Sequence, residues 1–289
     1  MSQNAPMKIP QSLTDWFADC PFAITAFSGG VDSSLVAWLA NHLLGPEKNL
    51  AVISASPSLK LSDLDEAKQF ALDNQIPLRI IVTREMENEN YLLNPVNRCF
   101  FCKQTLYKEL EELAGSLPGS WILNGTNTED LGDYRPGLEA AKNHCVRSPL
   151  AECGLDKAAV RALAAGLKLK CWDKPASPCL SSRIPYGLRV TPAKLRRIEA
   201  AESWLNEHGF PVCRVRHLEG TARIEVRPED IGTLHSIEAE MTAAMRALGF
   251  LSVEIDPEGF VSGKLNRSIG KEVAKPVSVG QKAPLSLKI

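Results

Sequence analysis

The chain has 289 residues, of which 44% are hydrophobic, and its 33 basic side chains nearly balance 34 acidic ones. This composition excludes an intrinsically disordered or broadly polycationic protein, and every apolar run is shorter than the ~20 residues of a membrane span. Residues 1–10 show neither a signal-peptide nor a transit-peptide pattern, so we expect a cytoplasmic protein with reduced thiols. The eight cysteines then need an explanation other than disulfide bonds.

Short apolar segments alternate with amphipathic ones in the first two-thirds of the chain. The predicted strands cover residues 23–27, 50–54, 78–82 and 121–123, and the predicted helices cover residues 34–44, 62–74, 102–114 and 156–166. This alternation is typical of an α/β fold in which a parallel sheet carries helices on both faces. We therefore expect one such domain over residues 1–188.

The pattern changes after residue 188. The elements predicted beyond it are a helix over 191–208, a hairpin of strands 212–217 and 222–227, a helix over 228–248 and a strand over 250–255. They form a small α+β domain over residues 189–268, which we expect to serve substrate binding or oligomerisation. Residues 269–289 lack periodicity and are predicted to be an extended or disordered tail.

Residues 28–34 read Ser-Gly-Gly-Val-Asp-Ser-Ser and lie between the first predicted strand and the next helix. Glycines let the backbone approach an anion, and the helix start offers free N–H groups and a positive dipole end. The loop has no lysine, so it is not of the Walker type. The residues of this loop that we expect to bind ATP are Ser28, Gly29, Gly30, Asp32, Ser33 and Ser34.

This heptapeptide resembles the signature of the PP-loop ATP pyrophosphatase family. The resemblance implies an adenine nucleotide alpha hydrolase-like fold and cleavage of ATP between its α and β phosphates, which adenylates a substrate oxygen. Gly125 follows the fourth predicted strand, where a glycine allows close approach to the nucleotide. Glu129, Asp130 and Asp133 follow it, and one or two of them could hold the Mg²⁺ that neutralises pyrophosphate.

Three cysteines lie in segments that suit a chemical role. Cys99 and Cys102 form a CxxC pair at the entry to a predicted helix, and Cys179 lies in a loop rich in proline and serine. Three thiolates suit a 4Fe-4S cluster whose fourth iron could take a sulfide, whereas Cys179 alone could give up its own sulfur. A zinc site or a redox pair remains open for the CxxC pair. The remaining cysteines read as small buried hydrophobes: Cys20, Cys145, Cys153, Cys171 and Cys213.

Longer stretches resemble one branch of the PP-loop proteins, the LarE family of ATP-dependent sulfur transferases of nickel-pincer nucleotide cofactor biosynthesis. The resemblance covers residues 12–267 and rests on residues 28–34, 132–138, 181–187, 209–211, 214–216 and 222–225. It implies a pyridinium dicarboxylate mononucleotide as the substrate, whose adenylated carboxylate becomes a thiocarboxylate. The CxxC pair is similar to the cluster-containing members, which implies a 4Fe-4S cluster on Cys99, Cys102 and Cys179. The family also implies a hexamer.

The basic residues beyond position 180 could bind the phosphate of such a mononucleotide. Residues 183–227 carry nine basic and five acidic side chains. Guanidinium groups suit a phosphate, and the expected ligands are Ser182, Arg183, Arg214 and Arg216. The alternative is that these arginines cover a sheet surface or pair with acidic neighbours.

Three other functions remain open. A tRNA thiolase combines the same loop with a three-cysteine cluster, but a net charge of -1 does not favour a nucleic-acid partner. An ammonia-using amide synthetase, such as NAD synthetase, shares the loop without needing the three cysteines. A nucleotide sensor would retain ATP without catalysis. The sequence does not identify the donor of sulfide.

Overall fold

The computed structural model describes residues 8–132, 136–261, 263–264 and 267. Its N-terminal part is built on a four-stranded sheet in the order β3-β2-β1-β4, and all neighbouring strands are parallel. The strands are β1 (Ala23–Ala26), β2 (Asn49–Ser54), β3 (Leu78–Ile81) and β4 (Trp121–Leu123). The predicted parallel α/β fold is therefore confirmed.

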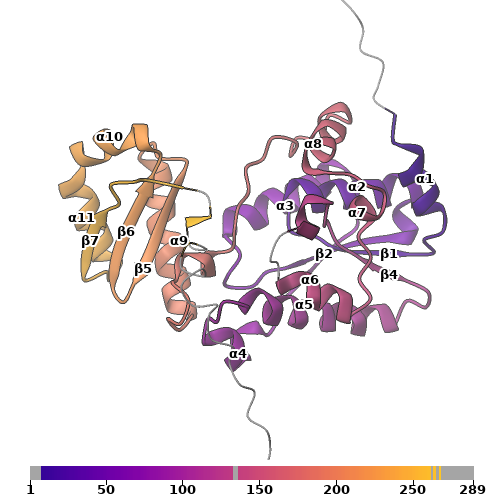
Figure 1. The fold of residues 1–289 in the computed structure, drawn as a ribbon, viewed down its shortest axis with the longest axis horizontal. Coiled ribbons are helices and arrows are strands. Elements are labelled where there is room, and N and C mark those ends of the chain that lie inside the picture. Colours follow the sequence, from indigo (N-terminus) through magenta and orange to yellow (C-terminus); the bar gives the residue numbers. More distant parts are fainter. Residues whose placement is uncertain (1–7, 133–135, 262, 265–266, 268–289) are drawn as a thin grey trace, which may run out of the picture.

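Helices cover both faces of this sheet (Figure 1). One face carries α1 (Gln11–Ala18), α2 (Val31–Leu44), α3 (Leu61–Asp73), α7 (Pro149–Glu152) and α8 (Lys157–Gly166). The other carries α5 (Arg98–Gly115) and α6 (Pro136–Asn143). Each set packs its apolar side chains in its own core against the sheet. No helix in the described ranges is long and apolar enough to cross a bilayer.

Short helical turns connect these elements. They are α4 (Glu89–Leu92) and the 3-10 turns η1 (Pro46–Lys48), η2 (Glu85–Glu87), η3 (Glu129–Gly132) and η4 (Leu180–Arg183). The structure corrects one predicted boundary, because α5 begins at Arg98 and not at residue 102. Cys99 and Cys102 therefore both lie in the first turns of α5, and their i, i+3 spacing puts them on one side of it.

The C-terminal part contains a second core around a three-stranded sheet. Strands β5 (Cys213–Leu218) and β6 (Thr221–Val226) form the predicted hairpin, β7 (Ser252–Ile255) runs parallel to β6, and α9 (Pro192–Glu207) packs on β5. The prediction of one helix over 228–248 is wrong. That segment forms η5 (Pro228–Asp230), α10 (Ile231–Ser236) and α11 (Glu238–Ala247). Ser236 Oγ donates to Thr233 O at 2.6 Å, a local bond that competes with continuation of the helix. The predicted tail lies outside the described residues.

Candidate functional site

The predicted ATP loop connects the end of β1 to the start of α2. Ser33 Oγ accepts a hydrogen bond from Ser28 N at 3.1 Å, lies 2.9 Å from Ser28 Oγ and donates to Gly30 O at 3.1 Å. Gly29 has a φ of +72°, and a Cβ there would lie 2.9 Å from Ala67 Cβ on α3. A glycine is therefore required for both its conformation and the contact with α3. The loop is closed on itself and rests against α3.

The β4 loop makes close backbone contact with the start of α2. A Cβ on Gly125 would lie 2.6 Å from Ser33 N and 2.8 Å from the carbonyl carbon of Asp32, so no other residue fits there without displacing the ATP loop. Ser34, one residue further along α2, is fully buried. The contact of Gly125 is with the protein backbone, and its approach to a nucleotide stays a prediction.

A lysine from a distant segment lies at the ATP loop. Lys157, in the first turn of α8, forms an ion pair with Asp32, and Asn127 Nδ2 donates to Asp32 Oδ1 at 3.2 Å. Lys157 is 125 positions from Asp32 in the sequence, so the pairing could not be predicted from spacing. Its one local signal was its position directly after Asp156, which caps α8. The structure thus supplies the cation that the loop sequence lacks.

The three acidic residues predicted for Mg²⁺ differ in their placement. Asp130 accepts a hydrogen bond from Asn127 N at 3.0 Å, and Glu129 accepts one from Lys157 N at 3.3 Å. These two carboxylates therefore belong to the loop beside the Asp32–Lys157 pair. Asp133 lies outside the described residues. The choice between them as Mg²⁺ ligands stays a prediction.

The Cys179 segment is attached to the same edge of the sheet as the ATP loop. Leu180 N donates to Ser58 O at 2.8 Å, in the loop after β2, and Ser177 Oγ donates to Asp63 Oδ2 at 2.7 Å, at the start of α3. Helix α3 also contacts Gly29 through Ala67. The exposed Cys179 and the ATP loop therefore share α3 as a neighbour, a proximity that the sequence supported only indirectly.

The thiols of α5 lie close enough to Cys179 to interact with it electrostatically. Burial raises the pKa of Cys99, and a negative charge on Cys179 raises it further, whereas Arg98 lowers it. Burial raises the pKa of Cys102 to about 12, with Glu85 and Cys179 as further causes. Within the described residues, no three Cys, His, Asp or Glu side chains converge as a site for a metal ion.

Arg183 is placed differently from its predicted role as a phosphate ligand. It is fully buried, and its Nε and Nη2 donate to the carboxylate of Glu202 at 2.8 and 3.1 Å. Its Nη1 donates to Pro178 O at 2.6 Å, Cys179 O at 3.2 Å and Ser182 Oγ at 2.9 Å. These contacts argue against Arg183 as a ligand of the substrate, because its donors already serve the backbone beside Cys179 and the Glu202 carboxylate.

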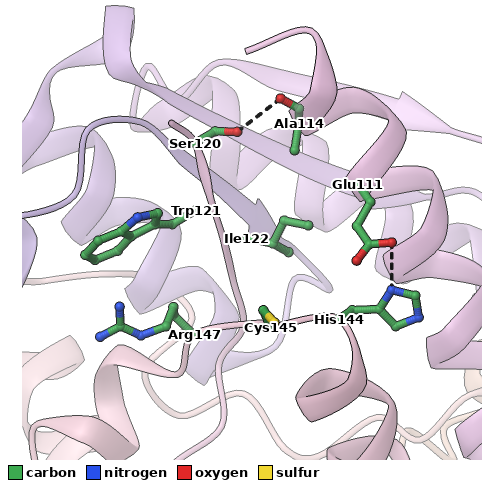
Figure 2. A pocket seen from close by; sticks show the side chains of 8 residues that line it. All are labelled: Glu111, Ala114, Ser120, Trp121, Ile122, His144, Cys145 and Arg147. Atoms are coloured by element: carbon green, nitrogen blue, oxygen red, sulfur yellow. Dashed lines mark hydrogen bonds and ion pairs between the residues drawn. The ribbon is translucent and has the colours of Figure 1, made fainter. Parts of the chain in front are cut away.

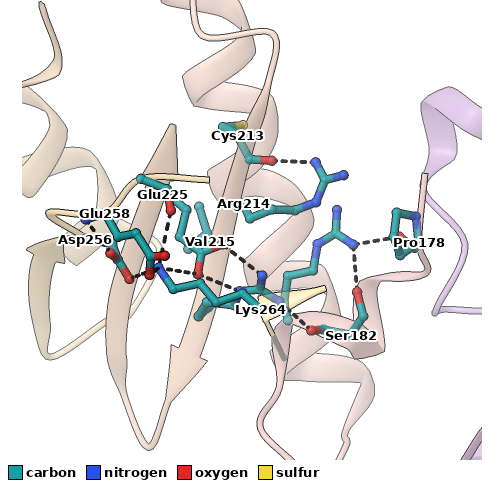
Figure 3. A network of polar contacts seen from close by, with 12 residues as sticks. Pro178, Ser182, Cys213, Arg214, Val215, Glu225, Asp256, Glu258 and Lys264 are labelled. Carbon is teal, nitrogen blue, oxygen red and sulfur yellow. Dashed lines mark hydrogen bonds and ion pairs between the residues drawn. The ribbon is translucent and has the colours of Figure 1, made fainter. Parts of the chain in front are cut away.

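Arg214 and Arg216 share a side of β5 but differ in their charge balance. Arg216 forms a two-point ion pair with Glu225 at 3.0 and 2.8 Å, and its Nη1 donates to Ser182 O at 2.8 Å. Arg214 donates to Cys213 O at 2.7 Å (Figure 3). Its guanidinium carbon lies 4.9 Å from the Phe260 ring centre. No carboxylate in the described residues forms an ion pair with Arg214. Its positive charge is therefore available to an anion.

The carboxylates near Arg216 also pair with a lysine, Lys264. Its Nζ lies 2.7 Å from Asp256, 3.2 Å from Glu258 and 3.9 Å from Glu225 (Figure 3). Burial lowers the pKa of Arg214, and the like charge of Arg183 is the next cause. Arg183 is paired with Glu202 and Arg216 with Glu225, so the excess positive charge of this region is concentrated at Arg214.

Two pockets open on the N-terminal part. One of about 710 Å³ lies beside Gly29, between α3 and residues 168–174. The other, of about 390 Å³, lies at the start of β4, the end of that strand remote from Gly125 (Figure 2). In it His144 Nδ1 lies 2.9 Å from Glu111 Oε2. None of the predicted site residues lines this second pocket, so it is separate from the candidate site.

Most of the chain is similar to known proteins. A family model described as NAD synthase matches residues 8–89, which include the ATP loop. The chain is 43% identical over 263 residues to the uncharacterized protein slr1717 of Synechocystis sp., covering 90% of this chain and 98% of that relative. It is 25% identical over 252 residues to the uncharacterized protein MJ0830 of Methanocaldococcus jannaschii, covering 87% and 95%.

A third relative has a described activity. The chain is 34% identical over 246 residues to the pyridinium-3,5-bisthiocarboxylic acid mononucleotide synthase of Lactiplantibacillus plantarum, covering 85% of this chain and 89% of that relative. The match to the NAD synthase model and the parallel sheet behind the ATP loop agree with this relationship. The chain belongs to the family of this synthase, the LarE family of PP-loop enzymes.

Proposed function

We propose that this protein is an ATP-dependent sulfur transferase that acts on a pyridinium dicarboxylate mononucleotide. The observation that carries the proposal is the attachment of the Cys179 segment and the ATP loop to the same helix, α3. A sulfur nucleophile beside an ATP loop is what conversion of a carboxylate to a thiocarboxylate requires. The product named for the L. plantarum relative, a pyridinium bisthiocarboxylic acid mononucleotide, supports the same chemistry.

The loop residues perform the first half of the reaction in this proposal. The start of α2 binds the phosphates of ATP, and Lys157 moves from Asp32 to the β and γ phosphates as they arrive. Asp32 is then free to hold Mg²⁺ together with Glu129 or Asp130. A substrate carboxylate oxygen attacks the α phosphorus, and pyrophosphate leaves beside Lys157, which balances part of its charge. Mg²⁺ would neutralise further charge when bound.

The cysteines perform the second half. A sulfur nucleophile attacks the carbonyl carbon of the acyl adenylate, the C–O bond to AMP breaks, and AMP carries away the electron pair. Cys99, Cys102 and Cys179 would hold a 4Fe-4S cluster, which supplies an iron site for a sulfide when bound. Cys99 and Cys102 each interact electrostatically with Cys179, and Arg98 and Lys103 lie beside them to balance thiolate charge. The chemistry of the donor set therefore suits this group, although the three side chains do not converge as a metal site within the described residues. The alternative is that Cys179 donates its own sulfur.

The test of this proposal separates the two sources of sulfur. The full chain is purified without oxygen, and iron, acid-labile sulfide and thiocarboxylate formation are measured with ATP and pyridinium-3,5-dicarboxylic acid mononucleotide. We expect about four irons per chain and repeated turnover when sulfide is supplied. The Cys99→Ala variant loses the iron and the repeated turnover, whereas the Cys145→Ala variant keeps the iron and the repeated turnover. Product formation by iron-free wild-type protein, with loss of one sulfur and two hydrogens from Cys179, would establish the sacrificial mechanism, and absence of any thiocarboxylate would refute sulfur transfer.

The unpaired charge of Arg214 leads to a prediction about the substrate phosphate. We expect Arg214→Ala to weaken binding of the mononucleotide by about ten- to a hundredfold, the value of a charge-assisted hydrogen bond of about 1.5–3 kcal/mol. Isothermal titration with the mononucleotide measures the change. The Arg223→Ala variant is the matched control, because it removes an equal charge from the neighbouring strand, where Arg223 pairs with Glu254. Equal affinities of the two variants would place the phosphate elsewhere.

A hexameric assembly is the part of the proposal that rests on the family resemblance. A cytoplasmic location rests on the sequence pattern, as does the division into an ATP domain over residues 1–188 and a substrate or oligomerisation domain over residues 189–268. Ser182 stays a candidate phosphate ligand, although its Oγ accepts from Arg183 and its carbonyl from Arg216. Size-exclusion chromatography with light scattering tests the assembly.

A further inference from the structure

A buried asparagine connects the helix of the CxxC pair to the Cys179 segment. Asn94, between α4 and α5, is fully buried and has a φ of +55°. Its Nδ2 lies 2.7 Å from Pro185 O, 3.0 Å from Leu188 O and 3.2 Å from Ile184 O, and its carbonyl accepts from Gly187 N at 2.9 Å. One side chain and its backbone therefore hold most of the turn that follows Cys179.

An arginine continues this connection to the cysteines themselves. Arg98 is 3% exposed, and its Nη1 donates to Asn94 Oδ1 at 2.5 Å and to Ser181 O at 2.9 Å. Arg98 directly precedes Cys99, and Ser181 lies two residues after Cys179. One guanidinium thus links the neighbours of two of the three thiols.

A tyrosine provides an independent link of the same kind. The hydroxyl of Tyr91, which is 1% exposed, lies 2.6 Å from Ser181 Oγ. Satisfied polar networks in a buried site favour one arrangement over its alternatives, because each broken bond leaves a polar group without a partner. Asn94 has a positive φ, in the left-handed region that asparagine adopts more readily than most non-glycine residues.

We propose that Asn94, Arg98 and Tyr91 are positioning residues that hold Cys179 against the Cys99–Cys102 pair. None of the three carries the sulfur that reacts or contacts the ATP loop in the described structure. Asn94 and Tyr91 contact the backbone and the Ser181 hydroxyl of the segment that follows Cys179, whereas Arg98 contacts both Ser181 O and the side chain of Cys99. That this positioning serves sulfur transfer rests on the proposed function. The position of Cys179 relative to Cys99 and Cys102 can itself be tested without ATP or substrate.

The test measures which cysteines reach one another. The full chain is reduced, freed of iron with a chelator and treated with diamide, and its disulfides are mapped by peptide mass spectrometry. Each disulfide forms as two thiols lose two hydrogens, which reduce diamide to its hydrazine. The Cys99–Cys102 disulfide lies within one helix and serves as the internal reference. The readout is the ratio of disulfides that contain Cys179 to this reference.

We expect Cys179 to be cross-linked readily in the wild type, and the ratio to fall by at least about tenfold in Asn94→Ala and Arg98→Lys. Arg84→Lys and Asn90→Ala are matched controls at exposed positions of the same stretch and keep the wild-type ratio. Tyr91→Phe removes only the hydroxyl, and we expect a smaller fall in the same direction. If circular dichroism shows that Asn94→Ala and Arg98→Lys do not fold, the ratio in Tyr91→Phe is the test of the positioning role.

Three results separate this proposal from the proposed function. Folded variants with the wild-type ratio, or a wild type in which Cys179 forms no cross-link to either thiol, would overturn the positioning role. A reduced ratio in the variants, together with a wild type that makes no thiocarboxylate, would uphold the positioning role and refute the sulfur transfer. General loosening of the fold is distinguished by the melting temperature of each variant, which falls when the whole fold is destabilised.

Discussion

The Cys179→Ala variant is expected to lose thiocarboxylate formation by at least about a thousandfold while it still releases pyrophosphate from ATP and substrate. Both proposed sources of sulfur use Cys179, either as a cluster ligand or as the donor, whereas adenylation depends on the ATP loop and Lys157. Pyrophosphate release in a single turnover and thiocarboxylate formation, measured on the same sample, report the two halves separately.

Cys145→Ala is the control for this experiment, because Cys145 is exposed and lines the pocket at the start of β4. It should leave both halves of the reaction unchanged. A Cys179→Ala protein that transfers sulfur at the wild-type rate would remove this residue from the chemistry. Loss of pyrophosphate release as well would mean that the Cys179 segment also shapes the ATP site, to which it is joined through α3.

The largest effect on stability is expected for Glu202→Gln. Glu202 is 1% exposed and accepts from Arg183, from Lys60 at 2.6 Å and from Val215 N at 3.1 Å. These partners come from the Cys179 segment, the loop after β2 and strand β5. A neutral amide leaves Arg183 buried without its counter-charge, so the free energy of unfolding falls by about 3–5 kcal/mol. Urea denaturation measures it, with Glu207→Gln, exposed on the same helix, as the control.

The pKa of Glu202 determines how the stability difference between wild type and Glu202→Gln depends on pH. Burial by itself would raise the pKa of Glu202, but Arg183 and Lys60 lower it from 4.5 to about 2. Since the unfolded chain binds this proton more tightly, the contribution of Glu202 is complete above pH 4.5 and is lost as the pH falls toward 2. The difference in unfolding free energy between wild type and Glu202→Gln should therefore shrink over that range. A difference independent of pH would show that charge is not its cause.

Local patterns were sufficient for most elements of the fold. The strands of the parallel sheet and helix α2 are marked by short apolar segments, and Asp156 and Thr191 accept the capping bonds that start α8 and α9. The start of α5 was placed too late, and the break between α10 and α11 was missed. In the second case a hydroxyl bond of Ser236 competes with the helix, and periodicity does not record such a bond.

Some residues of the candidate site could be recognised from local sequence, and others could not. A contiguous segment such as residues 28–34 carries its anion-binding geometry within itself, because glycines and a helix start act locally. Lys157 reaches Asp32 from 125 residues away, and Asn94 reaches the turn after Cys179 from about 90. Residues so far apart in the sequence show no spacing from which either contact could be predicted.

The sequence by itself indicated a composition typical of globular proteins, a parallel α/β fold, an ATP loop and three cysteines suited to sulfur chemistry. Only the tertiary structure decided which charges are free to act. Arg183, Arg214 and Arg216 look alike in the sequence, but Glu202 neutralises the first and Glu225 the third. The available charge of an arginine depends on the carboxylate that folding brings within hydrogen-bond distance, and that partner is set by how separate segments pack.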